Sequence, residues 1–504
     1  MKIISEEVLG AEATAVLEAA NIECIVDANL TRWQEGDALI LSGNAPVPEA
    51  LYETNRPPKV IAHLNKDSQY VDAKKATRAG IMLLEPRHGE AASIADYAMS
   101  MVLKMARERQ EGAFELKGKS IGFLGFTPTA AEIAQRARGF DMNLYCYDAD
   151  LNRGRAMLYN CEATTLVDLF VMSDFVIVLA PLSSHTKALI GKDEIQLLKK
   201  GASLIHLTDP QVLRWDELVM CLDWEYLSHF AIDLPSNKAH LKGEIERYAT
   251  VTVNEAANTL EARRGNEVEM VRHTVAVLEG EMVETAVNVA HLRASHAKEG
   301  ADWCRLANFL GQCMGQRLKK LPGNCTIEAK GFLPGSEREA IIAHALTGVA
   351  IGMGEGAINP INAALWAEEH GMHIRFEEDI EQAHGHLKIS MITELGRFQF
   401  AGDIINGVAS IFQVDDYLLR ARPTAHVLLV PHINRPGMVG QVGTLLGEEE
   451  VNISGMVLGH KHHDLSTALM WITIEQAPDA ELAAQSKRLS SVLSMEYIHL
   501  QMDI

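Results

Sequence analysis

The sequence lacks the features of several protein classes. Its 504 residues hold only seven cysteines, an odd number that is widely scattered and contains no C-x-x-C pair. Such cysteines are typical of small buried residues in a reducing cytoplasm, and they argue against a disulfide framework or a metal site. An apolar run of about 18 residues, which a membrane-spanning helix needs, is missing. The acidic start MKIISEEVLGAEA also lacks the apolar core of a signal peptide.

Positive charge is scarce as well. The chain has 46 Lys and Arg against 67 Asp and Glu, which gives a formal net charge of −21. This balance argues against nucleic acid or an anionic membrane as the main partner. The hydrophobic fraction of 47% is ordinary for a globular protein, and the length predicts three or four domains. We therefore expect a multidomain cytoplasmic protein.

The stretch from Gly118 to Asp148 predicts a strand, a tight turn at Gly125, a helix over about Thr129–Arg138 and a second strand that ends in Asp148. This is the opening unit of a dinucleotide-binding fold, in which an acid about 20 positions beyond the glycine turn holds a ribose. Asp148 fits that role, and it equally fits a polar strand end that caps a turn.

The phosphate loop departs from the pattern G-x-G-x-x-G, because its three positions are Gly125, Thr127 and Ala130. Gly125 can make the turn, and alanine is tolerated at the third position. Thr127 places a β-branched side chain where the backbone should approach a pyrophosphate. Pro128 lacks the N–H that such a loop offers. The pattern predicts a dinucleotide-binding scaffold with a weakened phosphate site.

Apolar runs at strand spacing divide the chain into α/β parts. Residues 1–96, to which we add 284–318, predict a small domain, and residues 97–283 predict a doubly wound parallel sheet. A polar KKLPGN linker at Lys319–Asn324 precedes a third domain over 325–423. Residues 424–504 predict the order βαββαβ, with helices over 438–450 and 479–492 and a last strand over 495–504.

Six motifs then occur in one order along essentially the whole chain: GKSIGFLG, SDFVIVLAPLSSHTKALIG (Ser173–Gly191), KKGASLIHL (Lys199–Leu207), AVNVAHL (Ala286–Leu292), AINPINAALWAEEHG (Ala357–Gly371) and NRPGMVGQVGTLL (Asn434–Leu446). On these motifs the sequence resembles the long form of the D-3-phosphoglycerate dehydrogenases. These are D-isomer-specific 2-hydroxyacid dehydrogenases extended by an intervening domain and a C-terminal ACT domain. The resemblance implies a flavodoxin-like first domain and NAD as the cofactor.

The resemblance also implies hydride transfer, with an arginine for the substrate carboxylate and a histidine as the base. The arginine position is Asp209, which would repel a carboxylate, and the histidine position is Asn254, which cannot exchange a proton near neutral pH. The loop Pro235–Ala239 offers no supporting glutamate. His206, at the end of a predicted strand, is the best substitute for the base.

The substrate side has changed too. The resemblance implies a phosphate-binding arginine where His63 stands, and an asparagine where Glu90 stands. A repurposed site built from His63, His88, Asp209, His206 and Glu255 is one reading of these changes.

The C-terminal motif keeps its residues. His432, Asn434 and Asn452 stand where the resemblance implies ligands for L-serine, or a similar small amino acid, at a dimer interface. Gly437 opens the next helix, whose N–H groups favour a carboxylate. The alternative is that these residues only cap turns. An open sheet edge in this domain predicts a homodimer or homotetramer, and assembly with an active homologue is compatible with it.

Three functions follow. The first is a catalytically impaired homologue that acts as a serine-responsive regulatory or assembly subunit. The second is an active NAD-dependent 2-hydroxyacid dehydrogenase of L-serine biosynthesis. The third is the repurposed site with different chemistry.

Overall fold

The computed structural model describes residues 1–43, 46–65, 71–108, 112–149, 151, 153–183, 185–223, 226–281, 283–289, 298–331, 338–379, 385–394, 396–479, 482–485 and 488–502. It divides into two compact units. The first consists of Met1–Val47, Val60–Val71 and Leu84–Glu279, and the second of Pro48–Lys59, Asp72–Leu83 and Gly280–Ile504. The α/β class predicted from the sequence is confirmed.

The chain begins with a five-stranded sheet of order β2-β1-β3-β4-β5. Its strands are β1 (Lys2–Ser5), β2 (Glu23–Val26), β3 (Ala38–Leu41), β4 (Val60–His63) and β5 (Met82–Leu84). The order is the flavodoxin-like one that the resemblance implied. β3 and β4 are buried along their whole length, as expected of parallel strands covered on both faces.

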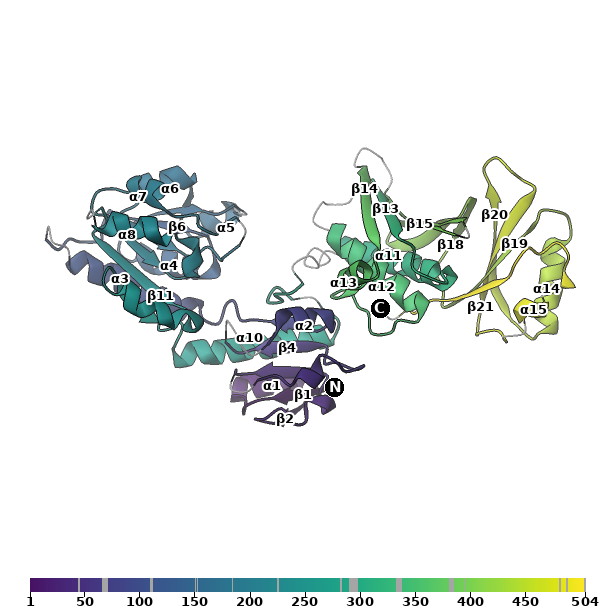
Figure 1. Ribbon diagram of the computed structural model, residues 1–504, viewed down its shortest axis with the longest axis horizontal. Helices are drawn as coiled ribbons and strands as arrows, with labels where there is room; N and C mark the ends of the chain where they lie inside the picture. Colours follow the sequence, from purple (N-terminus) through teal and green to yellow (C-terminus); the bar gives the residue numbers. More distant parts are fainter. Residues whose placement is uncertain are drawn as a thin grey trace. The chain divides into compact units, whose positions relative to one another are not determined.

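A seven-stranded sheet of order β12-β11-β10-β9-β6-β7-β8 follows in the first unit (Figure 1). The bounds of its strands are β6 (Ser120–Leu124), β7 (Asn143–Tyr147), β8 (Glu162–Ala163), β9 (Phe175–Val178), β10 (Ser203–His206), β11 (His229–Leu234) and β12 (Thr250–Val253). Neighbouring strands of this sheet run parallel, and the strand order reverses between β6 and β9. One apolar core lies on each face. This is the predicted doubly wound sheet.

The helices of these two sheets have the following bounds: α1 (Ala11–Ala19), α3 (Ala91–Arg107), α4 (Pro128–Arg138), α5 (Arg153–Leu158), α6 (Leu166–Met172), α7 (Lys192–Gln196), α8 (Trp215–Asp223), α9 (Lys242–Ile245), α10 (Leu260–Leu278), and the short 3-10 helices η1 (Trp33–Glu35), η3 (Pro210–Val212) and η4 (Ser236–Leu241). The buried side chains of α3 recur at helical spacing, which gives the helix one face packed against the protein.

The second unit contains a ten-stranded mixed sheet of order β14-β13-β15-β16-β17-β18-β20-β21-β19-β22. Its strands are β13 (Asn324–Lys330), β14 (His373–Asp379), β15 (His386–Thr393), β16 (Gly396–Ile405), β17 (Val408–Val414), β18 (Tyr417–Ala421), β19 (His426–Ile433), β20 (Ile453–Lys461), β21 (Thr467–Ile474) and β22 (Glu496–His499). Its helices are α2 (Ala73–Arg78), η2 (Glu49–Leu51), α11 (Lys298–Arg317), α12 (Arg338–Met353), α13 (Ala363–Glu369), α14 (Met438–Glu448) and α15 (Leu482–Gln485).

Residues 424–504 have the predicted order βαββαβ (Figure 1). Their sheet edge at β20 pairs with β18 through Tyr417↔Lys461 and Leu418↔His460, so this edge is partly covered by the chain itself. The predicted helix 479–492 is wrong in length, because α15 has only four residues and Val492 forms a β-bridge with His432. Residues 480–481 and 486–487 of that helix, and 503–504 of the predicted last strand, lie outside the described residues.

Helix α11 crosses α12 at unusually close range. A Cβ on Gly311 would meet the carbonyl oxygen of Ala345, and a Cβ on Gly348 would meet that of Asn308. Glycine at such points lets two helix backbones touch. The sequence grouped residues 284–318 with the first domain. In the structure most of this segment is α11, which packs on α12, β15 and β16 instead, and its glycines meet those of α12 at the crossing.

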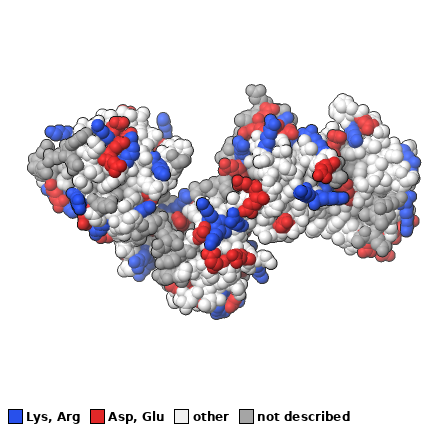
Figure 2. All heavy atoms as spheres, viewed as in Figure 1, with Lys and Arg blue, Asp and Glu red and all other residues white. Residues whose placement is uncertain are grey.

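Charge is mixed on the surface. On the face drawn in Figure 2, acidic and basic side chains are interspersed over the described residues. A dispersed arrangement of this kind favours solubility over a single electrostatic docking patch.

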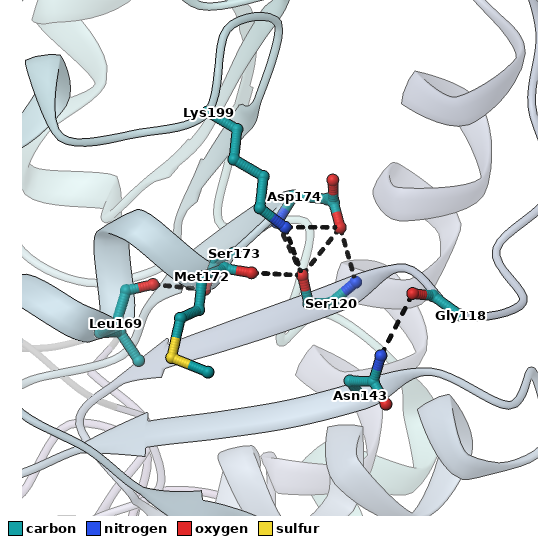
Figure 3. Close-up of polar contacts among 8 residues, drawn as sticks. All are labelled: Gly118, Ser120, Asn143, Leu169, Met172, Ser173, Asp174 and Lys199. Atoms are coloured by element: carbon teal, nitrogen blue, oxygen red, sulfur yellow. Dashed lines mark hydrogen bonds and ion pairs between the residues drawn. The ribbon is translucent and has the colours of Figure 1, made fainter.

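The amino ends of β6 and β9 are tied together by a polar cluster (Figure 3). The Oδ2 atom of Asp174 accepts hydrogen bonds from the backbone N–H (2.9 Å) and the Oγ (2.7 Å) of Ser120. The ammonium group of Lys199 donates to the same oxygen at 3.2 Å. Burial alone would raise the pKa of Asp174, but the bonds from Ser120 and the charge of Lys199 outweigh it and hold the pKa below its usual value.

We expect Gly348→Ala to destabilise the second unit by about 1–3 kcal/mol, because the new methyl group must push the α11 backbone away. The measurement is urea unfolding followed by circular dichroism. Gly443→Ala in α14 is the matched control, since its Cβ would enter open space and should stabilise the helix by about 0.5–1 kcal/mol. Equal effects of the two substitutions would contradict the close crossing.

We expect Asp174→Asn to cost about 1.5–3 kcal/mol at pH 7, because a charged hydrogen-bond acceptor is lost. A carboxyl whose pKa is lowered on folding stabilises the protein above its unfolded pKa of about 3.9, and that contribution disappears as the pH falls through the folded pKa. The difference between wild type and variant should therefore shrink below about pH 4. Thermal unfolding at several pH values, with the exposed Asp216→Asn as control, measures it. A constant difference down to pH 2 would argue against this assignment.

Candidate functional site

The turn between β6 and α4 has the geometry of a dinucleotide-binding loop. Gly125 has a φ of 94°, in the left-handed region. A Cβ at this position would lie 2.6 Å from the backbone nitrogen of Ala180, just after β9. Only glycine fits such a turn. The predicted loop therefore lies where the strand order reverses, the place at which open α/β sheets bind ligands.

Two N–H groups of this turn are used by the protein itself. The N–H of Phe126 donates to Oδ2 of Asp148 at 2.9 Å, and that of Ala130 donates to Oγ1 of Thr127 at 3.4 Å. Pro128, the first residue of α4, has no N–H to give. A pyrophosphate at a helix N-terminus needs these donors, so the residues present fit a dinucleotide poorly. Asp148 does what the turn-capping alternative predicted, whether or not it also contacts a ribose.

Asp209, at the position that the resemblance assigns to an arginine, caps a short helix. Its Oδ1 accepts the N–H of Gln211 at 2.8 Å at the start of η3. A carboxylate here cannot provide the positive charge that an anionic substrate needs.

His206, the candidate substitute base, is the last residue of β10 and is fully buried. Its Nε2 lies 3.0 Å from the carbonyl oxygen of Asp209. Burial lowers the pKa of His206 to about 4, although the carbonyl and carboxylate of Asp209 act in the opposite direction. A general base must come within hydrogen-bond reach of its substrate. The enclosed ring of His206 does not meet this requirement, so it is a poor candidate.

Asn254, at the position assigned to the catalytic histidine, follows β12 with a φ of 51°. Its side chain is exposed, and its N–H donates to the carbonyl oxygen of Leu234 at 2.9 Å. The adjoining loop is held by Asp233 of β11, which accepts Thr252 Oγ1 at 2.6 Å and the N–H of Ala256 at 3.0 Å. The sequence analysis overlooked Asp233, although an acid near the end of a buried strand is a recognisable signal.

The first sheet shows the same arrangement at its carboxyl edge. The buried carboxylate of Glu6, just after β1, accepts the N–H (2.7 Å) and Oγ (3.0 Å) of Ser42 and the N–H of Gly43 (2.9 Å). His63, at the position assigned to a phosphate-binding arginine, is 3% exposed. Burial lowers the pKa of His63 to about 4 against the opposing effect of Glu6. This residue is therefore an uncharged buried ring at neutral pH.

Glu269 of α10 holds the loop after β5. Its carboxylate accepts the N–H groups of Arg87, His88 and Gly89 at 3.1–3.2 Å. Glu90, the last residue before α3, is buried and accepts from Nδ2 of Asn266 at 3.0 Å. His88 lies in the loop after β5 and Glu255 in the loop after β12, so the residues of the predicted repurposed site are spread over both parallel sheets.

A common feature joins these loops. Five side-chain carboxylates hold backbone N–H groups at or near the carboxyl ends of the two parallel sheets, and we call them the strand-end carboxylates: Glu6, Asp148, Asp209, Asp233 and Glu269.

The C-terminal motif lies at one end of β19. His432 is 3% exposed, with its Nδ1 3.1 Å from the carbonyl oxygen of Val430. Asn434 is exposed, and its Nδ2 donates to the carbonyl oxygen of Leu465 at 2.9 Å. Gly437 follows as the left-handed N-cap of α14. His432 and Asn434 thus flank the start of this helix, as the sequence predicted.

Asn452 does not join them within one chain. It precedes β20, whose first residue pairs with Ile474 of β21, whereas Ile433 of β19 pairs with Thr467 at the other end of β21. Seven residues separate Thr467 from Ile474, and a strand rises about 3.3 Å per residue. Asn434 and Asn452 therefore lie at opposite ends of the sheet, about 23 Å apart.

Among the described residues, no group of three or more His, Cys, Asp and Glu side chains is placed to hold a metal ion. The search of the described helices also found none long and apolar enough to span a membrane.

Comparison with known proteins shows that this chain is similar to dehydrogenases. Residues 91–253 match the family model of the D-isomer specific 2-hydroxyacid dehydrogenase NAD binding domain, and residues 301–414 match that of the D-3-phosphoglycerate dehydrogenase intervening domain. The D-3-phosphoglycerate dehydrogenase of Methanocaldococcus jannaschii is 23% identical, with 99% of this chain and 100% of that protein aligned. The Bacillus subtilis enzyme of the same name is 22% identical over 92% of each chain.

Among solved structures, the NAD+-bound 3-phosphoglycerate dehydrogenase of Entamoeba histolytica aligns with a TM-score of 0.47 and 18% identity, covering 57% of this chain and 98% of that one. The family models and the nearly full-length relatives agree with the order of the sequence motifs. Residues 91–253 and 301–414 therefore belong to these two domain families, and nearly the whole chain is similar to D-3-phosphoglycerate dehydrogenases.

Proposed function

We propose that this chain is a phosphoglycerate dehydrogenase homologue with little or no turnover, which acts as an amino-acid-responsive regulatory or assembly subunit. The observation that carries the proposal is the set of strand-end carboxylates. Hydride transfer to a 2-oxo acid needs donors for a pyrophosphate and a cation for a carboxylate. In this chain, the strand-end carboxylates accept the N–H groups of the corresponding turns.

The electrostatic consequence supports the same conclusion. A carboxylate that accepts the N–H groups of a turn occupies donors that a bound anion would otherwise use. A substrate or cofactor anion would have to displace Glu6, Asp148 or Glu269 from these donors while also facing their negative charge. The two catalytic positions add no compensation, since Asp209 is acidic and Asn254 cannot take up a proton.

The C-terminal βαββαβ sheet is the sensing part of the proposal, and we assign it the role of an ACT domain that binds L-serine or a similar small amino acid. His432 and Asn434 offer donors and acceptors beside the N-terminus of α14, where a carboxylate is favoured. Because Asn452 lies at the other end of the sheet, a complete ligand set requires Asn452 from a second copy. The proposal therefore includes a homodimer, or a larger assembly built from it.

The compartment we assign is the cytoplasm. All seven cysteines are thiols in the structure, and six of them are buried. Buried thiols persist where the redox potential is reducing.

The alternative function is an active NAD-dependent D-3-phosphoglycerate dehydrogenase of L-serine biosynthesis. Its support is the full-length match to relatives of that name and the retained turn at Gly125. It requires a loop movement that releases Phe126 from Asp148 and a base other than His206.

Titration with NADH, followed by fluorescence, separates the two functions. We expect the wild-type chain to show no saturable binding below about 1 mM, a binding free energy weaker than about 4 kcal/mol. The double variant Thr127→Gly, Pro128→Ala restores a glycine and an N–H to the loop, so it should bind more tightly. A micromolar Kd for the wild type, or turnover of 3-phosphohydroxypyruvate at an ordinary enzymatic rate, would favour the active enzyme instead.

Calorimetry with L-serine tests the sensing part. We expect binding that Asn434→Ala and Asn452→Ala each weaken by at least about fivefold, since each removes hydrogen bonds worth about 1 kcal/mol or more. Asn258→Ala, an exposed change in the first unit, is the control and should leave binding unchanged.

Mixing the two variants gives a sharper result. In a mixed dimer one site carries both alanines, while the other carries Asn434 and Asn452 intact. We therefore expect half of the sites in each mixed dimer to recover wild-type affinity. The absence of heat at millimolar serine would remove the sensing role, and the absence of recovery on mixing would overturn the site shared between two chains.

A further inference from the structure

Two glutamines of α11 bind the backbone at the end of the chain. Gln316 accepts the N–H of His499 through Oε1 at 2.8 Å and donates from Nε2 to the carbonyl oxygen of the same residue at 2.7 Å. Gln312 makes the same pair of bonds to Gln501, at 2.8 and 3.3 Å. Each side-chain amide thus satisfies both backbone groups of one residue.

The spacing explains why this works. Two residues four positions apart on a helix are separated by about 6 Å along its axis, and two residues two positions apart on a strand by about 6.6 Å. The inner edge of the terminal segment faces β19, where the N–H of Leu500 donates to the carbonyl oxygen of Ala425 at 2.8 Å. The outer edge faces the glutamines, so the helix takes the place of a further strand.

Arg317 strengthens the contact next to the glutamines. Its side chain is 13% exposed, and it forms ion pairs of 2.8 Å with Glu496 of β22 and with Asp415 of the β17–β18 turn. The guanidinium also lies over the ring of Phe398, at 4.6 Å. A buried cation with two carboxylates and an aromatic face is costly to separate. Three elements of the second unit therefore meet at the end of α11.

Another contact of α11 is the close glycine crossing with α12. Helix α11 accordingly has two tight attachments, the glycine crossing and the glutamine contacts to residues 499–501. The strand β19 that pairs with β22 also carries His432 at its far end. A change in the position of β19 is thus conveyed to α11 through hydrogen bonds that can be made or broken.

We propose that Gln312 and Gln316 form a latch that holds β22 and the residues up to Gln501 on α11. The latch couples the C-terminal βαββαβ sheet to the α11–α12 pair and has a docked and a released state. Its use as a relay for ligand binding at His432 and Asn434 rests on the proposed function; the latch itself does not.

Hydrogen–deuterium exchange of a peptide covering residues 496–502 tests the latch. In Gln312→Met, Gln316→Met, which keeps side-chain length but removes all four bonds, we expect the exchange of this peptide to rise at least about tenfold. Peptides from β21 should keep their wild-type rates. Gln441→Met, an exposed change on α14, is the matched control and should leave the peptide unaffected.

A second variant guards against general unfolding. Gln316→Glu keeps an acceptor for the N–H of His499 but cannot donate to its carbonyl oxygen while ionised. We expect intermediate exchange at pH 7 and a return towards wild type near pH 4, as the carboxyl takes up a proton. Unchanged exchange in the double variant, or an equal rise in every peptide of the sheet, would overturn the latch.

Serine addition tests the relay. We expect serine to alter the exchange of α11 in the wild type and not in the double variant. Serine binding without any change in α11 would overturn the relay. If calorimetry shows that serine does not bind, the proposed sensing role fails, and the peptide at 496–502 alone decides the latch.

Discussion

Backbone N–H groups at the carboxyl ends of parallel strands need acceptors, and both parallel sheets of this chain depend on how that need is met. In many α/β proteins a bound anion provides the acceptor. Here the strand-end carboxylates do so, from Glu6 in the first sheet to Asp233 in the second. Each acid stabilises its loop and keeps negative charge at an edge where relatives of this fold bind anionic molecules. In the proposed function, the stability of these loops and a weak affinity for anionic ligands would have the same physical origin.

Local patterns were sufficient to predict much of the fold. The helix predicted over about Thr129–Arg138 is α4, Pro128–Arg138, because apolar periodicity reports which face is buried. The tight turn at Gly125 was also predicted from the sequence. The packing partner of α11 could not be predicted, because the sequence of a helix does not show which distant helix it will pack against. The pairing of β18 with β20 likewise depends on strands far apart in sequence.

The sequence predicted which residue types stand at the candidate site better than it predicted how they are arranged in space. The residue types at 209 and 254 could be read directly from the sequence, together with the chemistry they lack. The enclosure of His206 could not, because polarity at a strand end looks the same whether the ring faces solvent or the backbone of Asp209. The separation of Asn434 from Asn452 was hidden for a related reason. Motif spacing gives order along the chain, and the strand register decides which end of a sheet each residue occupies.

Placing Asn434 and Asn452 at opposite ends of one sheet has a consequence for how such a sensor would respond. A binding site divided between two molecules obeys mass action, so its apparent affinity depends on the protein's own concentration as well as on the ligand's. Dilution would empty it at constant amino-acid level, and ligand would in turn favour association. The occupancy of such a site would then depend on the cellular concentration of the chain as well as on that of the amino acid.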